Sequence, residues 1–224
     1  MGSGWPADEN ALDEAQDALA AATPPPWGPA GAPLVAGCFV CFGRGVGGRG
    51  TGGEPGWAAA ALGDTGAVAV VRGPAGAPYE PGRLALREGP LLEAAVRALP
   101  RRPDVLLVDA TGRDHPRRGG LALHLGSVLD LPTVGVTHRP LLAEGPWPAP
   151  ERGARAPLVL AGEEVGAWLR VAARRRPLAV HAAWRTDADA AVTVVLGALG
   201  RVRTPEPLRR ARHAARVARA RDGG

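Results

Sequence analysis

The chain has 224 residues, of which 46% are hydrophobic, and this length and composition indicate one globular domain with a sizeable core. All 27 basic residues are arginines that begin at Arg44, whereas five of the 22 acidic residues precede it, so residues 44–224 carry a net charge of +10. Such a charge favours polyanionic partners, and because no apolar run approaches the ~20 residues that span a bilayer, we expect a cytoplasmic protein without a membrane partner.

The first 33 residues are expected to form a helix and a linker ahead of one domain that spans residues 34–220. Residues 6–22 carry apolar side chains at helical spacing, and Asp8 is a suitable N-cap residue for this helix. Residues 23–33 contain five prolines and two glycines, a composition that is typical of linkers.

Three strands are predicted next, at residues 34–42, 57–62 and 67–72, and the turns between them predict an antiparallel meander. The glycine-rich segment 43–56 lacks the GxxxxGK[ST] pattern of a phosphate-binding loop, so we interpret it as a flexible hairpin tip. Cys38 and Cys41 are three residues apart in the first strand and therefore face opposite sides of it. This spacing argues against a disulfide between them.

Helices and strands alternate in the rest of the chain. Helices are predicted at residues 84–99, 120–129, 187–199 and 206–219, and strands at 104–108, 133–136, 158–170 and 178–180. Gly89 and Pro90 are helix breakers inside the first of these helices, and the proline-rich residues 141–156 are expected to form a loop. The order of elements predicts a single α/β domain with a mixed sheet flanked by helices, which is the order of the ribonuclease H-like fold.

A candidate site lies where the strand at residues 104–108 ends. Asp109 follows this buried strand and begins a turn, at the edge where open α/β sheets place ligands and metals. His115, Arg117 and Arg118 follow shortly afterwards, so an acid, an imidazole and two guanidinium groups are expected to converge on a spot the size of a phosphate. The alternative interpretation is that Asp109 caps a loop and that the arginines are solvated.

Four motifs resemble the endonuclease V family, whose members nick DNA or RNA near inosine. They are PYEPG at 78–82, LALREGPLLEA at 84–94, LLVDATGRDHPRRGGLALHLGSVLDLPTVGV at 106–136 and PEPLRRARHAA at 205–215. The motifs occur in the family's order and at its intervals, across roughly residues 34–215. The resemblance implies a ribonuclease H-like, metal-dependent hydrolase of phosphodiester bonds that acts in DNA repair on inosine-containing DNA or RNA, and we expect a monomer.

The resemblance also implies a set of catalytic residues. Glu88 and Asp109 match two of the three carboxylates that bind Mg²⁺ in the family, with Mn²⁺ as the alternative ion, and His115 matches a histidine that follows the second of them. Hard oxygen ligands suit Mg²⁺, which polarises a phosphate and activates water. We therefore expect Glu88, Asp109 and His115 to converge in one pocket as the catalytic residues.

Nucleic-acid contacts are implied by the same motifs. Tyr79, which follows Pro78, matches a tyrosine that acts as a wedge and opens the duplex beside a flipped base, although Glu80 stands where the family usually has an apolar residue. A wedge of this kind offsets the cost of unstacking the base. Pro78, Tyr79, Arg117 and Arg118 are thus the expected nucleic-acid-binding residues.

Three positions depart from the family's pattern. Phe39 stands in the first strand where the family has an aspartate, His138 stands in place of a lysine, and Trp184 stands in place of a histidine. Each change removes a charge or a polar group from the expected reaction centre. The loss of one of three carboxylates should weaken Mg²⁺ binding, and the loss of an electrostatic stabiliser typically costs orders of magnitude in rate.

Two functions therefore remain open: a metal-dependent endonuclease, and a non-cleaving or weakly active relative that keeps the fold, the Tyr79 wedge and the basic surface. Cys41, Asp114 and Asp187 are the candidate replacements for the missing ligand. A thiolate is a poor ligand for Mg²⁺, and an ordinary exposed acid is the simpler interpretation of both aspartates.

Overall fold

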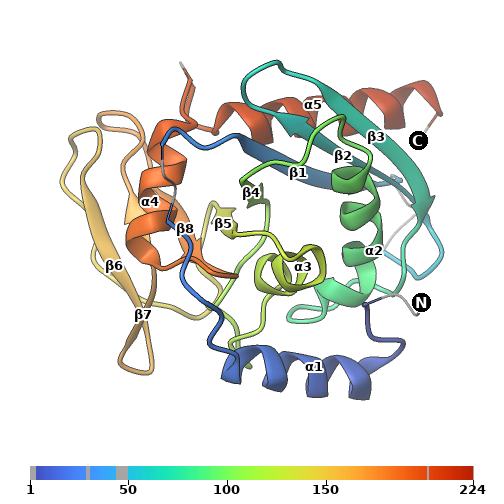
Figure 1. Cartoon of the computed structure of the whole chain (residues 1–224), viewed down its shortest axis with the longest axis horizontal. Helices are drawn as coiled ribbons and strands as arrows, with labels where there is room; N and C mark the ends of the chain where they lie inside the picture. The colour runs from blue at the N-terminus through green and yellow to red at the C-terminus, as the bar shows by residue number, and fades with distance from the viewer. Residues whose placement is uncertain (1–3, 29–30, 44–49, 201, 224) are drawn as a thin grey trace.

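An eight-stranded mixed sheet with the strand order β3-β2-β1-β4-β5-β8-β7-β6 organises the computed structural model of the chain (Figure 1). The structure describes residues 4–28, 31–43, 50–200 and 202–223. The strands are β1 (Val35–Phe42), β2 (Pro55–Leu62), β3 (Val68–Pro74), β4 (Val105–Val108), β5 (Thr133–Thr137), β6 (Arg155–Leu160), β7 (Glu163–Leu169) and β8 (Leu178–Ala182). The helices are α1 (Glu9–Ala21), α2 (Leu84–Arg97), α3 (Leu121–Leu129), α4 (Ala188–Gly197) and α5 (Glu206–Arg221).

The predicted meander is confirmed, because β1 pairs with β2 and β2 pairs with β3, both antiparallel. The strands β1, β4 and β5 run parallel to one another. Their carboxyl ends therefore meet at one edge of the sheet, which is where ligands bind in open α/β sheets. Asp109 directly follows β4 and lies at this edge.

Helices cover both faces of the sheet, and alternate residues of β1 face the two layers (Figure 1). Ala36, Cys38 and Val40 pack on the side of α2 and α3, whereas Phe39 and Cys41 pack against α5. Both cysteines are free, as their spacing predicted. Phe39 therefore lies on the α5 side of the sheet, where its ring contacts side chains of α5.

The helix α1 lies against the main domain below α3 (Figure 1). Its predicted cap is confirmed, since the Asp8 side chain accepts a hydrogen bond from the Ala11 amide at 2.9 Å. Leu12 is fully buried, and the Trp5 ring stacks on His124 with 4.7 Å between ring centres. In the described part of the chain, no helix is long and apolar enough to cross a membrane.

The predicted helix at residues 84–99 is confirmed as α2, which continues through Gly89 and Pro90. The Trp5 ring packs against Gly89, where a β-carbon would come within 2.2 Å of it. The prediction of one strand at residues 158–170 was wrong. These residues form most of a hairpin of two antiparallel strands, β6 and β7. The chain reverses at Ala161 and Gly162, which both have positive φ, as in a type I′ turn.

The segment 43–56, interpreted from the sequence as a flexible hairpin tip, lies partly outside the described residues, since residues 44–49 are not among them. The described part of this segment packs against the turn that carries Tyr79. The Gly50 carbonyl accepts a hydrogen bond from the Tyr79 amide at 3.3 Å, and the Gly53 amide donates to the Ala75 carbonyl at 2.7 Å. The end of the segment is thus part of the scaffold around Tyr79.

Candidate active site

The carboxylate of Asp109 is held by an arginine from the last helix. Arg212 Nη2 donates to Asp109 Oδ1 at 2.7 Å, and Arg212 Nε donates to Asp109 Oδ2 at 3.2 Å. Both side chains are partly buried, with 16% of Arg212 and 24% of Asp109 exposed. A two-pronged, charge-assisted pair of this kind fixes both groups in one geometry.

Arg212 was not among the residues that the sequence singled out. A signal for it exists in the helical spacing of α5, because Arg212 comes four residues after Leu208, which is fully buried, and therefore lies on the same side of the helix. Arg216 continues this row by one more turn. The spacing predicts which arginines of α5 face the sheet, once it is known that α5 packs on it.

The ring of Phe39 faces α5, and two guanidinium groups lie over it. The Cζ atoms of Arg212 and Arg216 are 5.7 Å and 5.5 Å from the ring centre. Cations are attracted to the face of an aromatic ring at such distances. The position where a carboxylate was expected from the resemblance is therefore occupied by an aromatic ring that attracts arginine.

Glu88 of α2 lies near Asp109. Burial and the negative charge of Asp109 raise the pKa of Glu88 to about 8, and the positive charge of Arg87 opposes this shift. The thiol of Cys38 lies beside the same two acids: burial raises its pKa first, and Asp109 and Glu88 raise it further. Glu88 is therefore mostly protonated at neutral pH.

His115 holds the turn that carries Tyr79. Its Nδ1 accepts a hydrogen bond from the Arg117 amide at 3.2 Å, so Nε2 carries the hydrogen and donates to the Gly82 carbonyl at 2.9 Å. Gln16 of α1, which the sequence did not single out, donates to the same carbonyl at 3.1 Å. Burial lowers the pKa of His115, which favours the neutral ring. Nε2 thus positions the turn, and the local hydrogen bond at Nδ1 fixes the orientation of the ring.

A cavity of about 170 Å³ lies between this turn and the carboxyl edge of the sheet. Its lining includes Tyr79, Gly82, Asp109, His115 and Thr137. Tyr79 is 41% exposed, so its ring stands at the surface beside the cavity. The cavity therefore has an exposed aromatic ring on one side and the paired carboxylate of Asp109 on the other.

Comparisons with known proteins identify the family. A model of the endonuclease V family matches residues 58–213 of the chain. The chain belongs to the endonuclease V family. Endonuclease V of Rhodospirillum centenum is 47% identical over 146 residues, which cover 63% of this chain and 60% of that protein. The chain thus spans somewhat less than two thirds of the length of the curated relatives it matches.

Solved structures of endonuclease V share the fold. The crystal structure of endonuclease V from Streptomyces avermitilis has a TM-score of 0.87 and 34% identity, and it covers 100% of this chain and 98% of its own. The structure of human endonuclease V has a TM-score of 0.79 and 28% identity, with 96% of this chain covered and 100% of its own. The predicted ribonuclease H-like α/β fold in a single domain is confirmed.

The spacing along the sequence predicted that Arg117 and Arg118 lie close to Asp109, but the structure gives both arginines other partners. Arg117 pairs instead with Asp13 and Asp17 of α1, at 2.9 Å and 2.8 Å. Arg118 donates to the Leu160 carbonyl at 2.7 Å. Both guanidinium groups have partners elsewhere, so the expected convergence was wrong for the two arginines, whereas Asp109 and His115 line the same cavity.

Other basic groups lie near His138 and Arg212. The pKa of His138 is lowered by burial and then by Arg203 and Arg212, whereas Asp109 opposes the shift, so His138 lies among these charges. Arg176 contributes to the same lowering. We call Arg176, Arg203, Arg212 and Arg216 the arginine cluster. The end of the sheet where endonuclease V motifs predict a reaction centre is therefore strongly positive.

Trp184 lies at the other end of the sheet. Its amide donates to the hydroxyl of Thr133, the first residue of β5, at 3.1 Å, whereas Thr137 at the far end of β5 lines the cavity beside Asp109. The ring packs on the core between the sheet and α3. Its assignment to the reaction centre, made from the endonuclease V resemblance, was therefore wrong.

None of the three suggested replacement ligands joins Glu88 and Asp109. Asp114 is fully buried and accepts hydrogen bonds from the amides of Leu141, Leu142 and Ala143 at 2.6 to 2.9 Å. Asp187 caps α4 by accepting from the Ala190 amide at 2.7 Å, and Cys41 packs among apolar residues against α5. Each of these side chains has a structural partner away from the site.

The residues present do not fit the divalent metal that the endonuclease V resemblance implies. Mg²⁺ and Mn²⁺ are held through carboxylate oxygens and water, but Phe39 removes one family carboxylate, and the positive charge of Arg212 binds both oxygens of Asp109. Within the described ranges, no group of three or more His, Cys, Asp or Glu side chains is placed to hold a metal. Glu88 and Asp109 are the two family carboxylates that remain.

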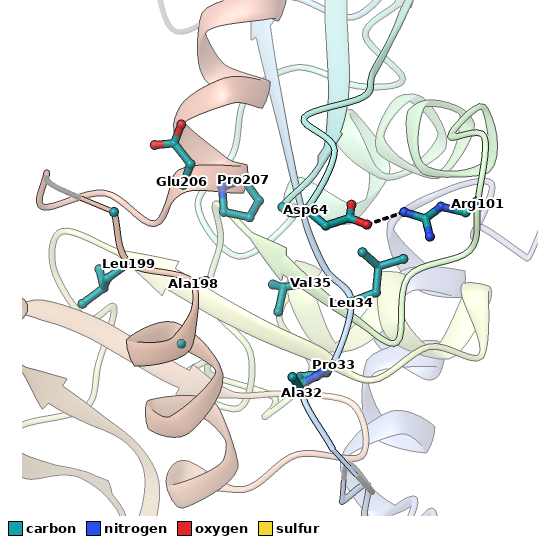
Figure 2. A pocket seen from close by; sticks show the side chains of 13 residues that line it. Ala32, Pro33, Leu34, Val35, Asp64, Arg101, Ala198, Leu199, Glu206 and Pro207 are labelled. Carbon is teal, nitrogen blue, oxygen red and sulfur yellow. Dashed lines mark hydrogen bonds and ion pairs between the residues drawn. The ribbon is translucent and has the colours of Figure 1, made fainter.

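A larger cavity of about 550 Å³ lies at the amino end of β1 and is separate from this site (Figure 2). Leu34, Val35, Asp64, Arg101 and Glu206 are among its lining residues. Asp64 forms an ion pair with Arg101, and Glu206 pairs with arginines of its own helix. Its charged groups thus all have ion-pair partners, and it lies at the opposite end of β1 from the edge where Asp109 lies.

Proposed function

We propose that this protein binds DNA or RNA that contains inosine or another deaminated base and acts on it as an endonuclease V-type hydrolase of phosphodiester bonds. The observation that carries the proposal is the cavity of about 170 Å³ between the exposed Tyr79 and Asp109. A cavity of roughly 150 Å³ can hold a benzene ring, so this one can accept a planar ring turned out of the base stack.

The proposed roles follow from these positions. Tyr79 and Pro78 form the wedge, and Arg87 supports it by donating to the Ala77 carbonyl at 2.7 Å. His115 fixes the other end of the turn through the Gly82 carbonyl. A wedge held at both ends loses little conformational freedom when a strand binds, which favours recognition.

The arginine cluster is assigned to the phosphates of the bound strand. Arginine forks match phosphate oxygens, and basic residues on α5 lie along the carboxyl edge where Asp109 stands. The endonuclease V family membership favours a role in the repair of deaminated nucleic acid, by a protein that acts as a monomer.

A second candidate is recognition of the same strands with weak or no cleavage. Two observations favour it: Phe39 replaces a family carboxylate, and Arg212 binds both oxygens of Asp109. Neither observation affects the wedge or the cavity. Recognition and cleavage are therefore separable in this chain, and the two candidates share the same binding site.

Tyr79→Ala is expected to remove the preference for inosine-containing strands while it weakens overall binding much less. The ring stacks at the opened duplex, and stacking of a base on an aromatic side chain contributes roughly 1 to 3 kcal/mol. The measurement is fluorescence anisotropy on two labelled duplexes that differ only in one inosine. We expect the preference to fall about tenfold or more in the variant.

Tyr79→Phe serves as the matched control, because it keeps the ring and removes only the hydroxyl group. It should retain most of the preference of the unsubstituted protein. An unchanged preference in Tyr79→Ala, or a protein that never distinguishes the two duplexes, would overturn the proposed recognition.

A further inference from the structure

The pairing of Asp109 occupies one lone pair on each oxygen of its carboxylate. Each oxygen accepts a hydrogen bond from a different nitrogen of the Arg212 guanidinium group, at 2.7 Å and 3.2 Å. A divalent ion at Asp109 would have to displace this charge-assisted, two-pronged contact or bind beside its fixed positive charge, in a partly buried setting. Arg212 already supplies the positive charge that a metal would bring to Asp109.

Phe39 fixes Arg212 from the other side. The guanidinium carbon of Arg212 lies 5.7 Å from the centre of the Phe39 ring while its nitrogens bind Asp109. Guanidinium groups stack on aromatic faces and bind carboxylates at the same time, a combination that a lysine ammonium does not match. The substitution that removes a carboxylate thus also creates a binding surface for the arginine.

The charge around Asp109 also opposes a metal. The positive charges of Arg176 and Arg203 help to lower the pKa of His138. The positive charges of Arg176 and Arg212 help to lower the pKa of Arg203, so these three arginines lie near one another. Arg216 lies over the Phe39 ring. Several fixed positive charges beside one ion-paired carboxylate repel a divalent cation and attract an anion such as a phosphate diester.

The outer nitrogen of Arg212 remains available to such an anion. Nε and Nη2 bind Asp109, whereas Nη1 makes no hydrogen bond to any residue that the structure describes. Arginine has five N–H groups, so a guanidinium that binds a carboxylate on one side can still donate to a phosphate oxygen on the other.

We infer that Arg212 takes the place of the divalent cation at Asp109, and that the site binds a nucleic-acid phosphate directly through arginine. The identity of the anion rests on the proposed function, whereas the exclusion of the metal rests on the Asp109, Arg212 and Phe39 geometry alone. The two parts are therefore tested by separate measurements.

The first measurement is Mn²⁺ binding to the protein alone, followed by electron paramagnetic resonance. The unsubstituted protein and Phe39→Asp should show no stoichiometric binding, because Arg212 is present beside Asp109 in both. Phe39→Asp/Arg212→Ala should bind one Mn²⁺ at least tenfold more tightly than either, since it restores a carboxylate and frees Asp109. Circular dichroism checks that the double variant is folded.

One result would overturn the exclusion of the metal. It is tight 1:1 binding of Mn²⁺ to the unsubstituted protein together with loss of this binding in Asp109→Asn. This outcome needs no folded double variant, so the test does not depend on one. Failure of the folded double variant to gain Mn²⁺ binding would contradict the inference as well.

The second measurement is binding of an inosine-containing strand in EDTA. Arg212→Ala should weaken it about tenfold and lower the dependence of log affinity on log salt by about one phosphate contact. Arg209→Ala is the matched control, since Arg209 lies on the same helix but pairs with Glu206 at the amino end of α5. Equal losses in both variants would show only a general charge effect and would reject the phosphate contact.

Discussion

Asp114→Asn is expected to lower the free energy of unfolding by about 2 to 4 kcal/mol. The carboxylate is fully buried, its Oδ2 accepts from the Leu141 amide, and its Oδ1 accepts from the amides of Leu142 and Ala143. An asparagine must turn its NH₂ group toward one of these donors, which leaves buried polar groups unpaired. Urea denaturation at neutral pH measures the change.

The matched control for this prediction is Asp187→Asn. Asp187 caps α4, and asparagine is as good a cap as aspartate, so the free energy of unfolding should change by less than about 0.5 kcal/mol. A similar loss in both variants would mean that the three amides of residues 141–143 do not depend on Asp114. Because this loop follows His138, Asp114→Asn should also loosen the carboxyl edge of the site.

Glu88→Gln is expected to stabilise the protein at pH 8 and to have little effect at pH 4. Burial and Asp109 raise the pKa of Glu88 to about 8 in the folded protein, above its ordinary value of 4.5. The folded state therefore binds the proton more tightly, and stability falls as the pH rises from about 4.5 to about 8. Glutamine removes this penalty, by about 1 to 3 kcal/mol at pH 8.

Thermal unfolding of both proteins in EDTA across this pH range is the measurement. The curves should coincide near pH 4 and separate steadily above pH 5, with Glu88→Gln the more stable protein. A variant that is less stable than the unsubstituted protein at pH 8 would mean that a positive charge neutralises Glu88 in the folded state.

Local patterns predicted most of the fold. The apolar runs and turns along residues 34–72 were enough to predict the meander, and the position of Asp109 after a buried strand was enough to place it at the functional edge. The hairpin of β6 and β7 was missed because Ala161, which has a positive φ, is not a typical turn residue, and Gly162 alone is a weak turn signal. The contact between Gly89 and Trp5 joins residues that are far apart in the sequence, so local patterns could not predict it.

The partners of the charged residues could not be predicted in the same way. Arg212 and Asp109 are separated by 103 residues, and α5 carries several arginines, so only the packing of the helix shows which one reaches the site. Arg117 is 100 residues from Asp17, to which it binds. The motif implies a catalytic role for His115, but it could not show that Nε2 of the ring binds the Gly82 carbonyl in the Tyr79 turn.

We expect this site to recognise inosine through its wedge, cavity and arginines without a divalent metal. The most direct test measures binding of the unsubstituted protein to two strands that differ in one inosine, in EDTA and in Mg²⁺. We expect the same preference for the inosine-containing strand in both buffers. A preference that appears only with Mg²⁺ would contradict this expectation.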